Sequence, residues 1–382
     1  MNILHLNSNL NRSKIHSNIV ESLNNLEGVD GRIFFPTEIK HHYIEYNESY
    51  IDKVKCINRY ERFFYFHRNN HLLKVSSELY KKNNFTHILA HSLFSNGKLA
   101  MDLSKKLGIP YSVIVTNTDV NKYFKKMIHL RKTGESILEN ASSVIFTSSS
   151  YKERVLEKYI SVDKKSGIDE KSSCIPFGIE DFWIDNRQKA QKDTKNEIKQ
   201  LLYVGKINKN KNLIFLADSI EKLNNEKNKE QFVLTIVGDC ENSKDEKIKQ
   251  NLIKRKYVKI INFADKEKLL NYYRAADVFI MISKTESFGL VYAEAMTQGL
   301  PIVYTKNEGF DKQFKDYLVG IPVNPKSYFE IKEAINHIEN NYKELSYNAF
   351  EHSEIFLWEN IAIRFKDCLL TKKDKVSNKE II

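Results

Sequence analysis

Several features are scarce or missing in this sequence of 382 residues. Its four cysteines form no Cys-x-x-Cys pair, which fits a reducing compartment and gives no support for a zinc site. Thirteen glycines and six prolines are too few for a low-complexity chain. No apolar run approaches the roughly 18 residues that span a bilayer, and the N-terminus is too short and polar for a signal peptide. We expect a cytoplasmic protein of about two domains.

Two motifs of nucleotide chemistry are absent as well. There is no Asp-x-Asp, so no metal bridging a diphosphate is expected, and no G-x-G-x-x-G, which disfavours nicotinamide chemistry. The net charge of +11 suits nucleic acid, anionic lipid or a phosphate-rich substrate, and it equally fits a coding bias toward lysine. A nucleic-acid partner is not expected, because the chain has no recognition motif for one.

Short apolar strands alternate with helix-period segments along most of the chain. The first half has expected strands at 2–6, 33–35, 87–90, 111–115 and 143–147, with helices at 14–26, 97–107 and 151–159. The pattern restarts with strands at 201–204, 232–237, 258–261, 278–282 and 302–304, and helices at 213–223, 266–275 and 290–298. This alternation predicts an α/β fold of two Rossmann-like doubly wound domains facing across a cleft, with ligands beyond the carboxyl ends of the strands.

The same pattern sets the expected boundaries. Residues 1–184 form the first domain, the polar stretch 185–200 is a linker, and 201–353 form the second domain. A last helix is expected at about 354–371, with Trp358 and Phe365 on its apolar side, followed by a flexible tail at 372–382.

The end of the first strand of the second half suits a diphosphate. Gly205 permits a tight turn, and Lys206 and Lys211 follow it where the next helix begins. Helix N-termini offer free N–H groups and partial positive charge, worth roughly 0.3–2 kcal/mol to a bound anion. Solvated loop lysines are the alternative interpretation.

A second cluster lies at the strand-to-helix turn after the strand 278–282. Ser287, Phe288, Gly289 and Leu290 make the turn, and their amides can also hold phosphate. Glu286 and Glu294 flank this turn about two helical turns apart, and carboxylates suit sugar and ribose hydroxyls. Two lysines for phosphates and two glutamates for hydroxyls predict a nucleotide-sugar site.

These residues resemble a known family, the GT-B retaining glycosyltransferases of family 4 (group 1). The resemblance rests on Val204–Ile207, Lys211–Asn212, Ile236–Asp239, Ala276–Val278, Glu286–Glu294 and Gly299–Val303, and more weakly on 141–149 and 175–179. It implies a nucleoside-diphosphate sugar as donor, no cofactor, and a last helix that crosses back to the first domain.

The resemblance also implies roles for single residues. Lys206 and Lys211 would bind the donor diphosphate. Relatives commonly have Arg at the position of Lys206. Glu294 would bind the ribose, and Glu286 would lie by the donor sugar as a catalytic residue. The backbone around Asn262 and Phe263 would face the base. Retention would follow from attack on the same face, with the leaving phosphate oxygen taking the acceptor proton.

The acceptor side in the first half is less clearly marked. Relatives often have a Gly-Gly loop after the first strand, where this chain has Asn7-Ser8-Asn9. His91 matches a His-Ser often seen at its place and is a catalytic candidate; a structural hydrogen bond is the alternative. Asn117 and Asp119 are acceptor-binding candidates, and Asp119 equally suits a helix cap.

Two basic stretches carry aromatic residues. Residues 121–132 hold five Lys or Arg and no acid, and 53–74 hold six with one acid. Such stretches can rest on an anionic membrane or serve a lipid-linked or saccharide acceptor, and a core-packing aromatic face is the alternative.

The sequence therefore predicts a metal-independent retaining glycosyltransferase that acts in surface polysaccharide or glycolipid assembly, with possible peripheral contact at the cytoplasmic membrane face. A sugar-nucleotide epimerase of the same fold and a non-catalytic GT-B partner subunit are the alternatives. Epimer formation without an acceptor would identify the epimerase. Absence of turnover with every donor would favour the partner subunit.

Overall fold

The chain divides into two compact units in the computed structural model, which describes residues 1–10, 14–38, 49–58, 60–61, 64–189, 199–226 and 232–370. The first unit consists of Met1–Phe177 and Trp358–Ile382, and the second of Gly178–Leu357. The boundary expected after residue 184 falls a short way inside the second unit. Part of the expected linker, residues 190–198, and the expected tail lie outside the described residues.

The first unit is built on a parallel sheet whose strands, in the described ranges, are ordered β3-β2-β1-β4-β5-β6-β7. They are β1 (Asn2–Leu6), β2 (Asp30–Glu38), β3 (Ile51–Ile57), β4 (His87–Ala90), β5 (Tyr111–Val115), β6 (Ser143–Phe146) and β7 (Ser172–Cys174). Side chains of a strand alternate between two faces, so Leu4 and Leu6 enter one hydrophobic core and Ile3 enters another.

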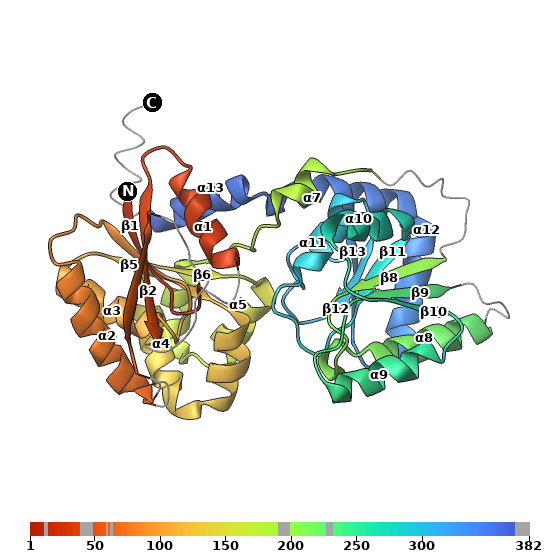
Figure 1. The fold of residues 1–382 in the computed structure, drawn as a ribbon, viewed down its shortest axis with the longest axis horizontal. Coiled ribbons are helices and arrows are strands. Elements are labelled where there is room, and N and C mark those ends of the chain that lie inside the picture. The colour runs from red at the N-terminus through yellow and green to blue at the C-terminus, as the bar shows by residue number, and fades with distance from the viewer. Residues whose placement is uncertain are drawn as a thin grey trace. The chain divides into compact units, whose positions relative to one another are not determined.

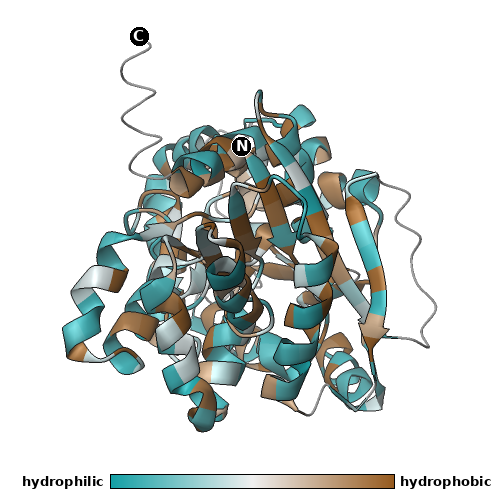
Figure 2. Cartoon of the chain, turned by 90° about the vertical axis from the view of Figure 1, so that its left-hand side faces the viewer, coloured by the Kyte–Doolittle hydropathy of each residue, from teal (hydrophilic) through white to brown (hydrophobic). Residues whose placement is uncertain are grey.

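Helices cover both faces of this sheet (Figure 1). One face carries α1 (Ile15–Asn24) and α13 (Trp358–Leu369). The other carries α2 (Tyr65–Leu79), α3 (Gly97–Leu107), η3 (Asp119–Phe124), η4 (Ile128–Leu130), α4 (Arg131–Asn140), α5 (Ser149–Lys158) and α6 (Val162–Glu170). In Figure 2 the central strands carry much brown, the colour of hydrophobic residues, and the surrounding helices alternate between teal and brown.

The second unit repeats the design on a smaller parallel sheet, ordered β10-β9-β8-β11-β12-β13 within the described part. Its strands are β8 (Gln200–Val204), β9 (Val233–Val237), β10 (Val258–Ile261), β11 (Val278–Met281), β12 (Ile302–Thr305) and β13 (Gly320–Val323). Its helices are α7 (Asp181–Asp185), η5 (Lys209–Lys211), α8 (Leu213–Glu226), α9 (Ser243–Ile253), α10 (Lys266–Ala275), α11 (Leu290–Thr297), α12 (Tyr328–His352) and η6 (Ser353–Phe356). The predicted fold class of two Rossmann-like domains is confirmed.

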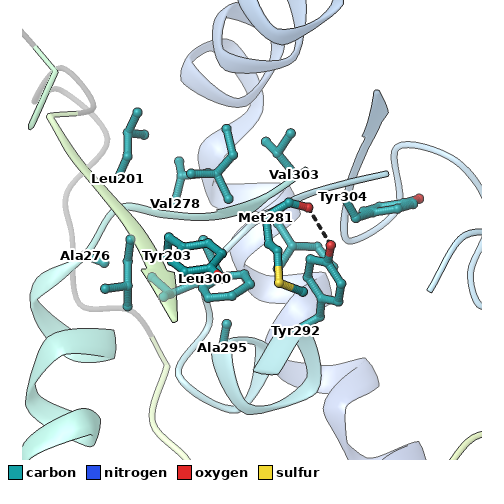
Figure 3. Packing of buried hydrophobic residues seen from close by; sticks show 14 of the residues in the cluster. Leu201, Tyr203, Ala276, Val278, Met281, Tyr292, Ala295, Leu300, Val303 and Tyr304 are labelled. Carbon is teal, nitrogen blue, oxygen red and sulfur yellow. Dashed lines mark hydrogen bonds between the residues drawn. The ribbon is translucent and has the colours of Figure 1, made fainter. Parts of the chain in front are cut away.

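In each sheet the strand order reverses once, between β1 and β4 and between β8 and β11. Ligands of open α/β sheets bind beyond the carboxyl ends of the strands at such a reversal. In the second unit the buried core reaches up to this edge (Figure 3). There the hydroxyl of Tyr292 on α11 donates to the carbonyl of Met281 on β11 at 2.5 Å. This bond fixes the start of α11 beside the end of β11.

Within the described residues, the single last helix expected at about 354–371 is interrupted near its start. The chain instead forms η6, an extended residue Leu357 (φ −60°, ψ 131°), and then α13. The cause lies in the packing, because Phe356 is buried in the core of the second unit and Trp358 in a core of the first. The chain leaves one core and enters the other across the extended residue Leu357.

Candidate functional site

Lys211 and Glu286, two of the predicted site residues, are in direct contact. The Nζ atom of Lys211 lies 2.6 Å from Oε2 of Glu286, and only 19% and 12% of the two side chains are exposed. Lys211 ends η5 just after β8, and Glu286 follows β11, so the pair lies where the strand order reverses. The side chain of Asn208 holds the lysine's turn by accepting hydrogen bonds from the amides of Asn210 and Lys211.

The carboxylate of Glu286 is held on both oxygens. Its Oε2 also accepts a hydrogen bond from the hydroxyl of Ser283 at 3.2 Å, and its Oε1 accepts one from the amide of Ser287 at 3.0 Å. The carboxylate and its ammonium partner therefore form a fixed charged pair rather than two mobile side chains.

The turn after Glu286 presents free donors. Gly289, with φ of +78°, is the N-cap of α11 and takes a conformation that suits glycine. Within the described residues, the backbone amides of Phe288, Gly289 and Leu290 have no hydrogen-bond partner. Unpaired amides at a helix start form an anion-binding site. The side chain of Phe288 is buried, while Ser287 is exposed.

This turn is supported by two residues that sequence reasoning missed. The amide of Glu286 donates to Oε2 of Glu308 at 3.0 Å, and its carbonyl accepts from the amide of Gly309 at 3.1 Å. The backbone at Gly309 lies so close that an added Cβ would sit 1.9 Å from the carbonyl oxygen of Ser287. The sequence around Glu308 and Gly309, which follow β12, does not indicate that they contact residues more than twenty positions earlier.

Gly205 lies at the end of β8, where two backbones cross closely. Gly205 and Gly238 have φ values of +142° and +154°, and a Cβ on Gly238 would meet the carbonyl oxygen of Gly205 at 2.0 Å. Lys206 follows, with 65% of its side chain exposed and an ion pair to Glu241. The structure therefore places Lys206 at the predicted edge but does not bring it into contact with Lys211 or Glu286.

Asn262 and Phe263 follow β10 at the same edge of the sheet. Asn262 accepts a hydrogen bond from Lys249 at 2.9 Å, and the amide of Phe263 donates to Asp239 at 3.1 Å. The ring of Phe263 is 80% exposed. An exposed aromatic ring beside a fixed backbone can stack on a flat apolar group such as a base.

Glu294 lies on α11, in the turn after the free amides. Its Oε2 accepts a hydrogen bond from the hydroxyl of Tyr273 on α10 at 3.0 Å. Burial raises the pKa of Glu294 to about 7, and the nearby Glu180 acts in the same direction. This carboxyl group is therefore balanced between its charged and neutral forms near neutral pH.

A bound nucleotide tests this balance. We expect its affinity to fall about tenfold from pH 8 to pH 6, because the ionised fraction of a group with a pKa near 7 falls by that factor. Glu294→Gln should bind weakly at both pH values. Calorimetric titration with nucleoside diphosphates measures this, with the exposed Glu267→Gln on α10 as the control. If the affinity of Glu294→Gln changed with pH as much as that of the wild type, another group would cause the effect.

In the first unit, His91 is the middle ring of a chain of three imidazoles. Its Nε2 lies 2.9 Å from Nδ1 of His5 on β1, and its Nδ1 lies 3.1 Å from Nδ1 of His16 on α1. Neutral rings have one donor and one acceptor each, so the three donate in a single direction along the chain. His5 and His91 are fully buried, and only His16 is partly exposed. The spacing of these histidines in the sequence gave no hint of the chain.

Asp119 and Asn117 lie at the end of β5. The carboxylate of Asp119 is buried and accepts hydrogen bonds from the amide of Phe94 at 3.0 Å and from the amide and hydroxyl of Thr116 at 2.9 and 2.8 Å. These hydrogen bonds hold the loop after β4 and the loop after β5 together. The side-chain oxygen of Asn117 accepts a hydrogen bond from the hydroxyl of Tyr151 at 3.3 Å, and Asn117 is the more exposed of the two candidates.

Two kinds of feature are absent from the described ranges. No group of three or more His, Cys, Asp or Glu side chains there is arranged to hold a metal ion. Among the same residues, no helix has the length and apolar character needed to cross a membrane.

Comparison with known proteins gives a match over the second unit. Residues 184–352 match the family described as "Glycosyl transferases group 1". This match confirms the group 1 part of the resemblance over these residues.

Two curated relatives align with much of the chain. The alpha-monoglucosyldiacylglycerol synthase of Acholeplasma laidlawii is 27% identical over 269 residues, which cover 66% of each chain. The putative teichuronic acid biosynthesis glycosyltransferase TuaC of Bacillus subtilis (strain 168) is 26% identical over 262 residues, which cover 66% of this chain and 61% of the relative. The chain thus spans slightly less than two thirds of the length of these relatives.

Solved structures share the fold over nearly the whole chain. The apo form of the lipopolysaccharide outer core galactosyltransferase WaaB has a TM-score of 0.75 at 16% identity and covers 96% of this chain and 99% of its own. The sucrose-phosphate synthase of Thermosynechococcus elongatus has a TM-score of 0.71 at 20% identity, with 96% and 98% covered. At these identities the likeness concerns the fold alone, and it confirms the predicted GT-B class.

Proposed function

We propose that this protein, whose residues 184–352 match the group 1 glycosyltransferases, transfers a sugar from a nucleoside-diphosphate donor to an acceptor hydroxyl with retention of configuration. The observation that carries the proposal is the pair of Lys211 and Glu286 beside the free amides of Phe288, Gly289 and Leu290. Cation and amides suit a diphosphate, and the carboxylate suits the hydroxyls of the attached sugar.

The proposed step needs no group outside the chain and its two substrates. The bond between the anomeric carbon and the diphosphate oxygen breaks, and a bond to the acceptor oxygen forms on the same face. The acceptor proton passes to the departing phosphate oxygen. Lys211 and the amides stabilise the negative charge that develops there, and preorganised donors of this kind supply large parts of a rate enhancement.

The other predicted residues complete this donor site. Lys206 would leave Glu241 for the diphosphate, since its present partner is exposed and weakly held. Glu294 would accept hydrogen bonds from the ribose, and Phe263 would lie against the base. The lysines and amides provide the neutralisation that a metal provides elsewhere, so the proposed reaction is metal-independent.

We further propose that the acceptor belongs to glycolipid or surface polysaccharide assembly at a membrane surface. The named roles of the two curated relatives support this setting. Exposed aromatic side chains in the basic stretch 53–74 support it too, because Tyr60, Phe64 and Phe66 are 71%, 64% and 52% exposed. Residues 59 and 62–63 of this stretch lie outside the described residues. Sedimentation with anionic vesicles tests it, and unchanged binding by a Phe64→Ser, Phe66→Ser variant would contradict it.

The test of the transfer reaction is donor turnover. We expect slow release of nucleoside diphosphate from one sugar donor, and a loss of about 10²–10³-fold in both Lys211→Ala and Glu286→Ala. Lys247→Ala, an exposed lysine on α9, is the matched control. Turnover that survives both substitutions, or an epimer formed without acceptor, would overturn the proposal.

A further inference from the structure

A pocket of about 480 Å³ lies on the second unit beside the first turns of α8 and α9. Its apolar part is formed by Leu213, Ile214 and Ile248. This volume is in the roughly 300–1,000 Å³ range of small-molecule sites. None of the residues assigned to the donor above lines it.

Three lysines from separate segments surround this pocket. Lys209 comes from η5, Lys244 from α9 and Lys284 from the loop after β11. In the described part of the chain none of their ammonium groups has a carboxylate partner. The one acidic residue in the lining is Asp245, which is 7% exposed and accepts a hydrogen bond from Asn242 at 2.7 Å. Three positive charges and one negative charge leave a net charge of +2.

Two backbone turns at the pocket are already satisfied. The side chain of Asn208 accepts hydrogen bonds from the amides of Asn210 and Lys211 in η5, and that of Asn242 accepts them from the first amides of α9. These two turns therefore contribute little to recognition here. A bound anion would therefore contact the lysine side chains, and an apolar group attached to the anion would contact Leu213, Ile214 and Ile248.

We propose that this pocket binds an organic phosphate whose apolar body rests on Leu213, Ile214 and Ile248 while its phosphate pairs with the three lysines. Tetrahedral anions suit several point charges arriving from different directions, which is how lysine ammonium groups bind phosphate. A soluble phosphate ester and a phospholipid headgroup share this chemistry.

The pocket is separate from the proposed donor site, although one turn forms a wall of both. Asn210 in that turn accepts a hydrogen bond from the amide of Lys284 at 2.8 Å on its carbonyl and one from the amide of Thr285 at 3.2 Å on its side chain. The neighbouring Lys211 reaches Glu286 and lies 3.6 Å from the sulfur of Met281. Phosphate binding in this pocket does not depend on glycosyl transfer, so it is expected even if the protein does not catalyse that reaction.

The experiment is a calorimetric titration of the full chain with hexyl phosphate, inorganic phosphate and hexyl glucoside. We expect hexyl phosphate to bind at least tenfold more tightly than inorganic phosphate, and hexyl glucoside not to bind. A Lys244→Gln, Lys284→Gln variant should weaken both phosphates at least tenfold. Ile248→Ser should weaken hexyl phosphate alone. Lys247→Gln, an exposed lysine of α9 outside the lining, should change neither.

Vesicles distinguish the two sources of the ligand. If phosphatidylcholine vesicles with phosphatidic acid bind the wild type more tightly than the Lys244→Gln, Lys284→Gln variant, the ligand is a lipid headgroup. Equal vesicle binding with weakened hexyl phosphate binding indicates a soluble ester. Hexyl phosphate binding that is unchanged in the lysine variant, with its thermal melting intact, overturns the proposal.

Discussion

Lowering the pH from 8 to 5 is expected to destabilise the first unit by about 4 kcal/mol and to stabilise the second by about 2 kcal/mol. The two effects have opposite signs because a different kind of buried group titrates in each unit. The first unit buries imidazoles in their neutral form, and the second buries a carboxyl group whose neutral form is favoured.

The first unit loses stability through its imidazole chain. Burial lowers the pKa of His5 to about 3 and that of His16 to about 4, and it holds the pKa of His91 well below 6.5. Above pH 6.5 these rings are neutral in the folded and the unfolded state, so they add no pH dependence. Below it the unfolded chain binds protons that the folded state does not, which costs about 2 kcal/mol for His5 and about 2 kcal/mol for His16 by pH 5, and His91 acts in the same direction. Burial raises the pKa of Asp119 in the same unit, which opposes this loss, while ordinary carboxylates titrate lower.

The second unit gains stability through Glu294. Its pKa is raised from 4.5 to about 7, so its contribution is fully present below 4.5 and is lost as the pH rises through 7. Glu294→Gln should therefore raise the stability of the second unit at pH 8 by about 2 kcal/mol. A residue that costs stability at working pH is typical of a binding site.

The two tryptophans make this measurable, because each unit contains one. Trp358, the first residue of α13, is buried in a core of the first unit together with residues of α1. Trp183 packs on Tyr273, the partner of Glu294, in the second unit. Urea unfolding followed by fluorescence in Trp183→Phe and Trp358→Phe variants separates the units. His16→Asn should remove about 2 kcal/mol of the acid loss of the first unit. A Trp358 transition with the same midpoint at pH 8 and pH 5 would contradict the account.

Local periodicity was sufficient to locate much of the fold. The strands His87–Ala90, Tyr111–Val115 and Val258–Ile261 and the helices Gly97–Leu107 and Lys266–Ala275 have the bounds expected from the sequence. They are short apolar runs or amphipathic segments with clear polar limits. In contrast, β3 and α2 were missed, because the stretch 51–79 mixes charges and aromatics without a clean period.

The candidate site was predictable only where its residues follow a strand. Lys211 and Glu286 were placed at one edge because parallel strands end together, and the structure brings them into contact. Glu308, Gly309 and the partners of His91 were not predictable, since those contacts join distant segments by backbone approach or ring-to-ring hydrogen bonds. Local spacing contains no information on such pairs.

Replacing Gly309 by alanine is expected to destabilise the second unit by about 3–5 kcal/mol. The new Cβ would lie 1.9 Å from the carbonyl oxygen of Ser287 and 2.3 Å from its carbonyl carbon, where real Cβ atoms stay beyond 3.0 Å. Neither contact is with a flexible side chain, so the two backbones must move apart. Separation would also lengthen the bonds that Glu308 and Gly309 make to Glu286.

A displaced turn would alter the proposed donor site as well as stability. Shifts of about 1 Å in a positioned group can lower turnover about 10²-fold, so we expect Gly309→Ala to lose donor turnover even where it remains folded. Gly167→Ala is the matched control, because a Cβ there meets nothing within 4 Å and Gly167 lies inside α6, where alanine is favoured by about 0.5–1 kcal/mol. Urea unfolding of both variants and donor turnover measure the contrast. If Gly309→Ala unfolds and turns over like Gly167→Ala, the backbone contact does not hold the turn that carries Glu286.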